Sequence, residues 1–275
     1  MIKDSSDSVF SLNSENQKNT QKRYKIIVAY DGTEYFGWQE QEFCASVAQT
    51  LQDTFARVFD RKITLRAASR TDSGVHALGN VAAFSCDLEI DIADMIKGWS
   101  NVLHPSILIR SIEEVPLDFN VHSNVKTKTY WYHVAVERPL PFIQRYCWYY
   151  RHAIDVEKLK KCVEQFLGIH DFRSFSTGDD RGTDTIRRID AVSVEFVSEY
   201  NVYRISISGP KFLKYMVRRM VGACIEVASR KNLEVCEIKK VLEAKNPEHL
   251  LPNAPAKGLV LYKIDYNINI LSENK

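Results

Sequence analysis

The chain has 275 residues, of which 45% are hydrophobic and 26% are charged, a composition typical of a globular protein with a core of its own. Its formal net charge of +2 is too small to indicate nucleic-acid binding by itself, because binding to phosphates depends on where Lys and Arg cluster. No apolar run approaches the roughly 18 residues that a membrane-spanning helix needs. We therefore expect no membrane association.

The N-terminal segment and the cysteines both favour a cytoplasmic protein. Residues 1–22 are polar, rich in Ser, Asn, Gln and Lys, and we expect a disordered tail there. Residues 1–20 contain acids and no Arg, unlike a signal or transit peptide. The six cysteines form no C-x-x-C pair, and none lies beside a His at zinc-site spacing. We expect reduced thiols and no metal.

The first half of the folded part, residues 23–120, shows four strand patterns and two helix patterns. Alternation, apolar runs and β-branched residues predict strands at 26–30, 63–68, 81–84 and 107–115. A capping box of Ser46 and Gln49 precedes a predicted helix that reaches about residue 58, and Asp91 can cap a second one. This order of strand, helix, strand, strand, helix, strand is that of a ferredoxin-like unit.

The second half, residues 121–268, repeats this order loosely, and residues 269–275 form a second predicted tail. Strands are predicted at 130–136, 192–196, 202–207 and 259–264. Helices are predicted from Asp155, as N-cap, to a C-cap at Gly168, then at about 212–230 and 235–244.

These patterns predict an α+β fold of two related ferredoxin-like (βαββαβ-type) halves, with a mainly antiparallel sheet flanked by helices. Two unrelated α+β domains remain the alternative.

A polar loop at residues 68–80 is the strongest candidate for a site of chemistry. It places Asp72 near Arg70, and its glycines, Gly74 and Gly79, permit backbone conformations that other residues resist. Loops braced by strands often carry catalytic groups. An Asp-Ser-Gly sequence alone more often forms a plain turn in which the Asp binds backbone amides, so the loop by itself leaves both interpretations open.

The context of this loop resembles the tRNA pseudouridine synthase A family. Six blocks occur in the family's order between about residues 24 and 268: YDGTEYFGWQ, SRTDSGVHA, KTYWYHV, GIHDFRSF, FLKYMVRRMVG and APAKGLVLYKIDY. Each block alone is weakly specific, whereas six in order at plausible spacing leave little room for coincidence.

The resemblance implies that the chain isomerises uridine to pseudouridine in the anticodon stem-loop of tRNA, at tRNA positions 38–40. It implies tRNA as partner, a homodimer, and a reaction that needs no cofactor, since nothing is added or lost. Asp72 matches the essential aspartate, which acts as a nucleophile or as a base on the sugar. The sequence leaves both routes open.

A catalytic carboxylate in a dry pocket needs a permanent cation nearby to stay ionised. Arg70 and Arg218 are the two candidates, and both are predicted catalytic residues. The alternatives are a solvated charge for Arg70 and a phosphate contact for Arg218. By the resemblance, Tyr130 is the active-site tyrosine, which can stack on uracil and transfer a proton; the alternative is a core aromatic.

The predicted substrate contacts are Tyr130, Lys128, Lys214, Arg219 and His76. Three positions depart from the family pattern: Ser69 stands for a glycine, Lys128 for an arginine and Arg219 for an asparagine. Basic residues interleaved with aromatics supply local positive patches, of which we expect about half to contact RNA: Lys126, Lys128, Arg145, Arg151, Arg187, Arg188, Lys211, Lys214, Arg218 and Arg219.

Helical geometry separates the two adjacent arginines. At 100° per residue, Arg218 falls at the edge of the apolar stripe of the predicted 212–230 helix, and Arg219 falls on its polar face. We therefore expect Arg218 to pair with Asp72 and Arg219 to serve at most as a phosphate contact.

Two other classes of protein compete with this interpretation. A non-catalytic RNA-binding protein could use two ferredoxin-like units, but the RNP1-type aromatic signature is missing. A zinc nucleobase deaminase would need an H-x-E and a P-C-x-x-C sequence, which the chain lacks.

Overall fold

The computed structural model describes residues 21–177, 184–248 and 251–267. The predicted tails at 1–22 and 269–275 lie outside these residues, apart from Gln21 and Lys22, and Lys22 already begins the first strand. Within the described ranges, no helix combines the length and hydropathy that crossing a membrane requires.

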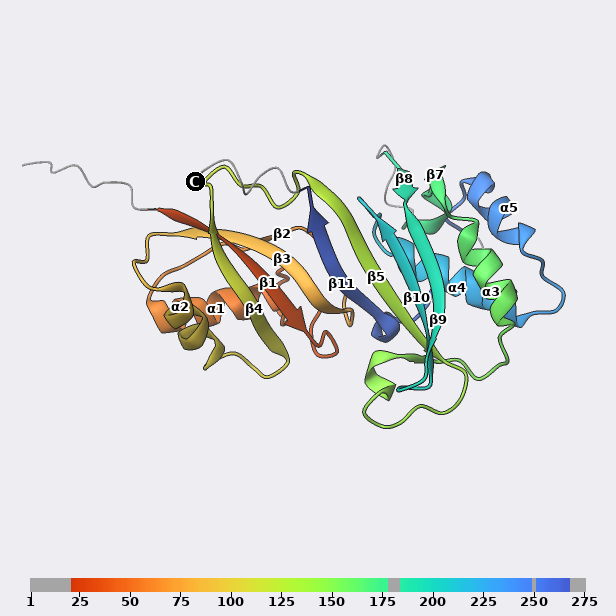
Figure 1. Cartoon of the computed structure of the whole chain (residues 1–275), viewed down its shortest axis with the longest axis horizontal. Helices are drawn as coiled ribbons and strands as arrows, with labels where there is room; N and C mark the ends of the chain where they lie inside the picture. Colours follow the sequence, from red (N-terminus) through yellow and green to blue (C-terminus); the bar gives the residue numbers. More distant parts are fainter. Residues whose placement is uncertain (1–20, 178–183, 249–250, 268–275) are drawn as a thin grey trace, which may run out of the picture.

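A nine-stranded sheet runs through the described part of the molecule (Figure 1). Its strands lie in the order β4 (Ile107–Val115), β1 (Lys22–Tyr30), β3 (His76–Cys86), β11 (Leu259–Tyr266), β5 (Val125–Ala135), β10 (Val202–Gly209) and β9 (Ala191–Val197), with the two-residue strands β2 (Arg66–Ala67) on β3 and β6 (Trp148–Tyr149) on β5. The pairs are antiparallel except β11 with β3 and β6 with β5. This mixed, mainly antiparallel sheet flanked by helices is an α+β fold.

Two groups of four strands meet in this sheet. The first group follows the chain order β1, α1 (Val47–Phe59), β2, β3, α2 (Ile92–Ser100), β4, and its strands lie in the spatial order β4-β1-β3-β2. The second follows β5, α3 (Val156–Glu164), β9, β10, α4 (Met216–Ser229), β11, with the spatial order β11-β5-β10-β9. In both groups the strand that comes fourth in the chain lies beside the one that comes first, and the strand that comes second lies at the far end of the group. The groups join where Val260 and Leu261 of β11 pair in parallel with His76 and Ala77 of β3.

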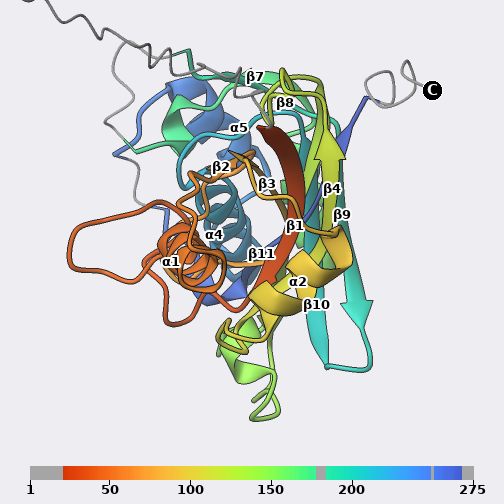
Figure 2. The ribbon, with the colours of Figure 1, turned by 90° about the vertical axis from the view of Figure 1, so that its left-hand side faces the viewer.

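The helices bury one face of the sheet. Alternate residues of β1 are buried, and α1 packs its own apolar stripe, with Leu51 and Phe55 fully buried, into the same core. Figure 2 shows α1 and α4 on the same side of the sheet. A last helix, α5 (Cys236–Ala244), packs against α4 and the turn η2 (Arg173–Phe175), beside a small sheet of β7 (Gly168–Asp171) and β8 (Ile186–Ile189).

The predicted caps are confirmed: the side chains of Ser46, Asp91 and Asp155 each accept a hydrogen bond from a backbone N–H at the start of their helix. Several predicted boundaries were wrong. The predicted helix 212–230 begins only at Met216, because Tyr215 takes a left-handed conformation with φ 61°. Helix α3 ends at Glu164, and Gly168, the predicted C-cap, instead begins β7 with φ +99°. The predicted loop 68–80 ends at His76, where β3 starts.

Candidate active site

The loop that carries Asp72 is held by the segment that follows β1. The Trp38 N–H donates to the Thr71 carbonyl at 3.1 Å, and the Gly74 N–H donates to the Tyr35 carbonyl at 3.2 Å. Gly37 has φ +91°, and a Cβ there would lie 2.6 Å from the Thr71 carbonyl oxygen, so only glycine allows the two segments to approach this closely. The backbone on both sides of Asp72 is therefore fixed.

Asp72 faces Arg218 of α4. The Arg218 Nη1 lies 3.5 Å from Asp72 Oδ2, and the two side chains keep only 15% and 16% of their surface exposed. Arg218 is itself oriented, because its Nε–H donates to the Ala254 carbonyl at 2.8 Å and its guanidinium lies 5.2 Å from the centre of the Tyr215 ring. The predicted pairing of Asp72 with Arg218 matches this geometry.

The position of Arg218 depends on Gly222, one turn further along α4. A Cβ at Gly222 would lie 2.1 Å from the Pro252 carbonyl oxygen and 2.8 Å from the Ala254 nitrogen. The absent side chain lets residues 252–254 lie against the helix, where the Ala254 N–H donates to the Arg218 carbonyl at 3.0 Å. Ala254 therefore binds both the backbone carbonyl and the guanidinium of Arg218.

Burial and nearby cations act in opposite directions on the carboxyl of Asp72. Burial raises the pKa of Asp72 above its ordinary value, and the charges of Arg218 and Lys214 work against this rise. Lys214 lies at the surface, with its Nζ 5.2 Å from the centre of the Tyr215 ring. Two cations therefore favour the ionised form of a carboxyl that burial would otherwise neutralise.

Tyr130 lies on β5 beside the same loop and is 7% exposed. Its hydroxyl shares a hydrogen bond of 2.7 Å with the Ser69 Oγ, and Phe212 packs edge-on against its ring at a centroid distance of 5.0 Å. Burial raises the pKa of Tyr130 to about 12, with a smaller contribution from the charge of Asp72. The phenol is therefore protonated at neutral pH. Ser69, where the family pattern has glycine, supplies a partner that the sequence did not reveal.

Lys128 also supports the loop from β5. Its Nζ donates to the Ala68 carbonyl at 2.6 Å. Arg70, by contrast, is exposed and forms no hydrogen bond or ion pair with another described residue. The structure brings Arg218, and not Arg70, against Asp72. Arg70 therefore fits the alternative interpretation from the sequence, a solvated charge.

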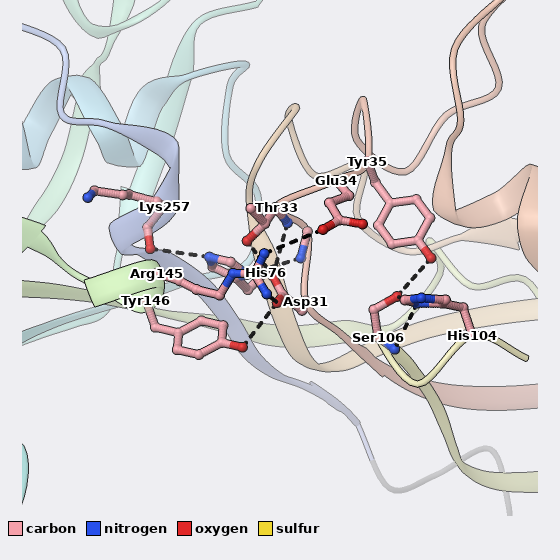
Figure 3. A network of polar contacts seen from close by, with 11 residues as sticks. Asp31, Thr33, Glu34, Tyr35, His76, His104, Ser106, Arg145, Tyr146 and Lys257 are labelled. Atoms are coloured by element: carbon pink, nitrogen blue, oxygen red, sulfur yellow. Dashed lines mark hydrogen bonds and ion pairs between the residues drawn. The ribbon is translucent and has the colours of Figure 1, made fainter. Parts of the chain in front are cut away.

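His76 belongs to a separate polar network (Figure 3). The Gly32 N–H donates to its Nδ1 at 3.0 Å, and its Nε2 lies 3.2 Å from the Lys257 carbonyl oxygen. Asp31 lies 3.1 Å from Nδ1 and accepts a hydrogen bond from the Tyr146 hydroxyl. Burial lowers the pKa of His76, which agrees with a neutral ring that accepts at Nδ1 and donates at Nε2. We expected a substrate contact, yet both ring nitrogens are occupied.

Arg219 points away from Asp72. Its Nη1 donates to the carbonyl oxygens of Pro247 at 2.8 Å and Ser174 at 3.3 Å, and its side chain is half-buried. The sequence predicted that Arg219 lies on the polar face of the helix, and in the structure η2 and the segment around Pro247 lie against this side chain. These bonds to protein carbonyls do not support the predicted role of Arg219 as a phosphate or substrate contact.

The site thus defines an α+β protein in which a buried carboxylate is paired with a helix arginine, near a buried phenol, where two groups of strands meet. Among the residues that the structure describes, no group of three or more His, Cys, Asp and Glu side chains is arranged to hold a metal ion.

The sequence profile described as tRNA pseudouridine synthase matches residues 26–122 and 162–267. The chain is 34% identical to tRNA pseudouridine synthase A of Thermotoga neapolitana, over 88% of this chain and 99% of that protein. It is 36% identical to the protein of the same name from Bdellovibrio bacteriovorus, over 89% of this chain and 95% of that protein. The chain therefore belongs to the tRNA pseudouridine synthase A family and is an isomerase. Asp72 and Arg218 lie in the matched ranges, and Tyr130 lies between them.

Proposed function

We propose that this enzyme isomerises uridine to pseudouridine in the anticodon stem-loop of tRNA, with Asp72 acting as nucleophile or base on the target nucleotide. The observation that carries the proposal is the Asp72–Arg218 pair. It is the arrangement that a buried, ionised catalytic carboxylate requires.

The reaction balances without any added reagent. The bond between N1 of uracil and C1′ of ribose breaks, the base turns while it is held, and a new bond forms between C5 and C1′. The proton leaves C5 to solvent, and N1 takes up a proton. A carboxylate that attacks or deprotonates the sugar is released again at the end, so Asp72 is regenerated.

The remaining residues have distinct roles in this proposal. Arg218 keeps Asp72 ionised as the site closes over the base. Tyr130 contacts the uracil that has been turned out of the RNA, which costs a few kcal/mol of stacking that an aromatic contact of about 1–3 kcal/mol partly returns. Its protonated hydroxyl can donate a hydrogen bond. Lys214, which is exposed beside Tyr215, contacts a phosphate of the RNA in this proposal.

The two groups of strands support a further part of the proposal. We infer that residues 23–120 and 121–268 are two related ferredoxin-like halves, because both groups have the same order of strands in the chain and in space. By the family resemblance, the enzyme acts as a homodimer in the cytoplasm. Light scattering on the purified protein, alone and with tRNA, measures the oligomeric state.

The decisive experiment is Asp72→Asn on an unmodified tRNA transcript, with pseudouridine measured by mass spectrometry. The change keeps the shape of the side chain and removes its charge, so isomerisation should be lost while tRNA affinity stays within a few-fold, because affinity comes mainly from phosphate contacts. Asp155→Asn is the matched control, since Asn caps α3 as well as Asp does. An Asp72→Asn enzyme with a tenth of the wild-type rate would remove Asp72 from the mechanism.

A further inference from the structure

A cavity of about 530 Å³ lies between β5 and the segments before α4 and around β8. It is lined by His122, Asn124, Val125, Lys128, Arg187, Pro210, Lys211 and Phe212. Three of these residues carry a permanent or near-permanent positive charge, and none is an acid. A cavity of this composition favours an anion.

The two lysines of the cavity lack a counter-charge. Among residues 21–177, 184–248 and 251–267, neither Lys128 nor Lys211 forms an ion pair with a carboxylate. Burial, and then the charge of Lys211, lower the pKa of Lys128 to about 8. Two like charges that line the same cavity raise the free energy of the empty site, and an anion bound there would remove that cost.

Arg187 adds a donor without a hydrogen-bond partner among the described residues. Its side chain is 14% exposed, and its Nε–H is buried without a hydrogen-bond partner among the described residues. Its Nη1 is used, since it donates to the Ile186 carbonyl at 2.7 Å and lies 3.6 Å from Asp184. The neighbouring Arg188 is different: it is 55% exposed and lies 2.6 Å from the Asp190 carboxylate.

The positive field extends toward the Asp72 loop. Burial lowers the pKa of His122, and the charges of Lys128, Arg70 and Arg66 lower it further. Arg70, which has no described partner, therefore lies close enough to the cavity to act on its wall. The charges of three cations therefore act on His122, in the wall of the cavity.

The cavity adjoins the candidate active site through two of its own wall residues. Phe212 packs against the Tyr130 ring at 5.0 Å, and Lys128 precedes Tyr130 by two residues on β5, which is about 6–7 Å along a strand. Lys128 also holds the Ala68 carbonyl in the loop of Asp72. An anion in the cavity would therefore lie next to the base that Tyr130 contacts.

We propose that Lys128, Arg187 and Lys211 form a subsite for one backbone phosphate of the RNA, adjacent to the nucleotide that reacts. This rests on the proposed function, because that function makes RNA the ligand. A phosphodiester has one charge and two free oxygens, which match ammonium and guanidinium donors. Held there, it fixes the position of the neighbouring ribose relative to Asp72.

The test is a scan of the substrate by neutral phosphates. Each phosphate around the target uridine in an anticodon stem-loop RNA is replaced in turn by methylphosphonate, and the affinity is measured by fluorescence anisotropy. Wild-type enzyme should lose about tenfold in affinity at one position. Lys211→Gln should lose about as much with unmodified RNA, and should show no further loss when that one phosphate is neutral, because the two changes remove the same contact.

Arg187→Gln should behave as Lys211→Gln does, and Arg188→Gln, which removes the same charge one residue away, should keep the wild-type pattern. Thermal unfolding of each variant checks its fold; Lys211 is exposed, so its variant keeps the test valid if Arg187→Gln fails to fold. The subsite proposal would be overturned if, at every phosphate position, the loss of RNA affinity caused by methylphosphonate were the same in Lys211→Gln as in wild-type enzyme.

Two further outcomes separate the subsite from the proposed function. If wild-type enzyme forms pseudouridine but no single phosphate depends on Lys211, the subsite is wrong and the function stands. If the enzyme forms none but the scan identifies one Lys211-dependent phosphate, the subsite stands and the function is wrong. The last measurement is a titration of the enzyme with inorganic phosphate. If inorganic phosphate binds in a Lys211-dependent manner, but no methylphosphonate position in the RNA depends on Lys211, the cavity binds a free anion and the proposal is overturned.

Discussion

Replacing Arg218 by Ala should slow the chemical step and leave tRNA binding nearly unchanged. The guanidinium lies 3.5 Å from the Asp72 carboxylate and is the main charge that opposes the rise in the pKa of Asp72 caused by burial. Without it, a smaller fraction of Asp72 is ionised at neutral pH, and the carboxylate loses the group that orients it.

The size of the effect follows from the distance and the exposure. Two unit charges at this separation attract by about 4–5 kcal/mol at an effective dielectric constant near 20. Solvent reaches both side chains, which are 15% and 16% exposed, so the measurable loss is smaller. We expect about 1.4–2.7 kcal/mol, or roughly 10- to 100-fold in rate.

The assay is single-turnover pseudouridine formation with enzyme in excess over tRNA, followed across pH. The proposed mechanism requires an ionised carboxylate, so the acid limb of the wild-type profile should report Asp72. This limb should move to higher pH in Arg218→Ala. Arg218→Lys should recover part of the rate, since the charge returns without the Nε–H that donates to Ala254.

Arg219→Ala is the matched control for this experiment. It removes the same charge from the next residue, but it loses bonds to the carbonyls of Pro247 and Ser174. It should lower the free energy of unfolding by about 1–3 kcal/mol and keep the chemical rate. The reasoning is refuted if Arg218→Ala keeps its rate within twofold and its acid limb in place, or if Arg219→Ala is the variant that loses the chemical step.

Three further predictions address the loop, the helix and the carboxyl. Ser69→Ala removes the partner of the Tyr130 hydroxyl and should lower the free energy of unfolding in urea by about 1 kcal/mol, with Ser69→Thr, which keeps a hydroxyl, losing less. Gly222→Ala places a Cβ 2.1 Å from a backbone carbonyl oxygen and should destabilise the fold by about 1–3 kcal/mol. Gly98→Ala in α2 places a Cβ in ordinary contact with the Phe59 ring at 3.4 Å and the Val58 side chain at 3.6 Å, and should stabilise the fold by about 0.5–1 kcal/mol. Equal melting temperatures for the two variants would contradict this. Burial raises the pKa of Asp72 on folding, so the contribution of this carboxyl to stability is present at low pH and is lost as pH rises through the folded pKa. Asp72→Asn should therefore gain stability relative to wild type as pH rises above the ordinary pKa of an Asp. A difference in stability that stays constant with pH would argue against a raised pKa.

Three of the helix starts could be predicted because their chemistry is local. Ser46, Asp91 and Asp155 cap helices through bonds to backbone groups two or three residues away, and such bonds depend on nothing distant. Strand extents were harder. The predicted strand 63–68 shrinks to Arg66–Ala67, and the Leu65 N–H is bound by the Gln52 side chain of α1 instead of a neighbouring strand. A side chain from another element decides that boundary.

The same distinction separates the two arginines of α4. The angle of Arg218 relative to the apolar stripe is local to the helix, and it correctly placed the side chain at the edge of the core. The environment of Arg219 is not local, because the residues around Pro247 and η2 reach it only after the chain has folded. Periodicity gives the direction of a side chain, but not what covers it.

The position of Asp72 in a loop, four residues before β3, matters for its chemistry. From His76 onward the backbone of β3 is paired with β1, and at its start with β11 as well, so a carboxylate on the strand would be fixed in the sheet. In the loop, the backbone is anchored by Trp38 and Tyr35 while the side chain is free to face Arg218 across the junction of the two strand groups. The carboxylate therefore meets its cation only when both groups have folded and joined. A loosened junction should lower catalysis before it lowers secondary structure.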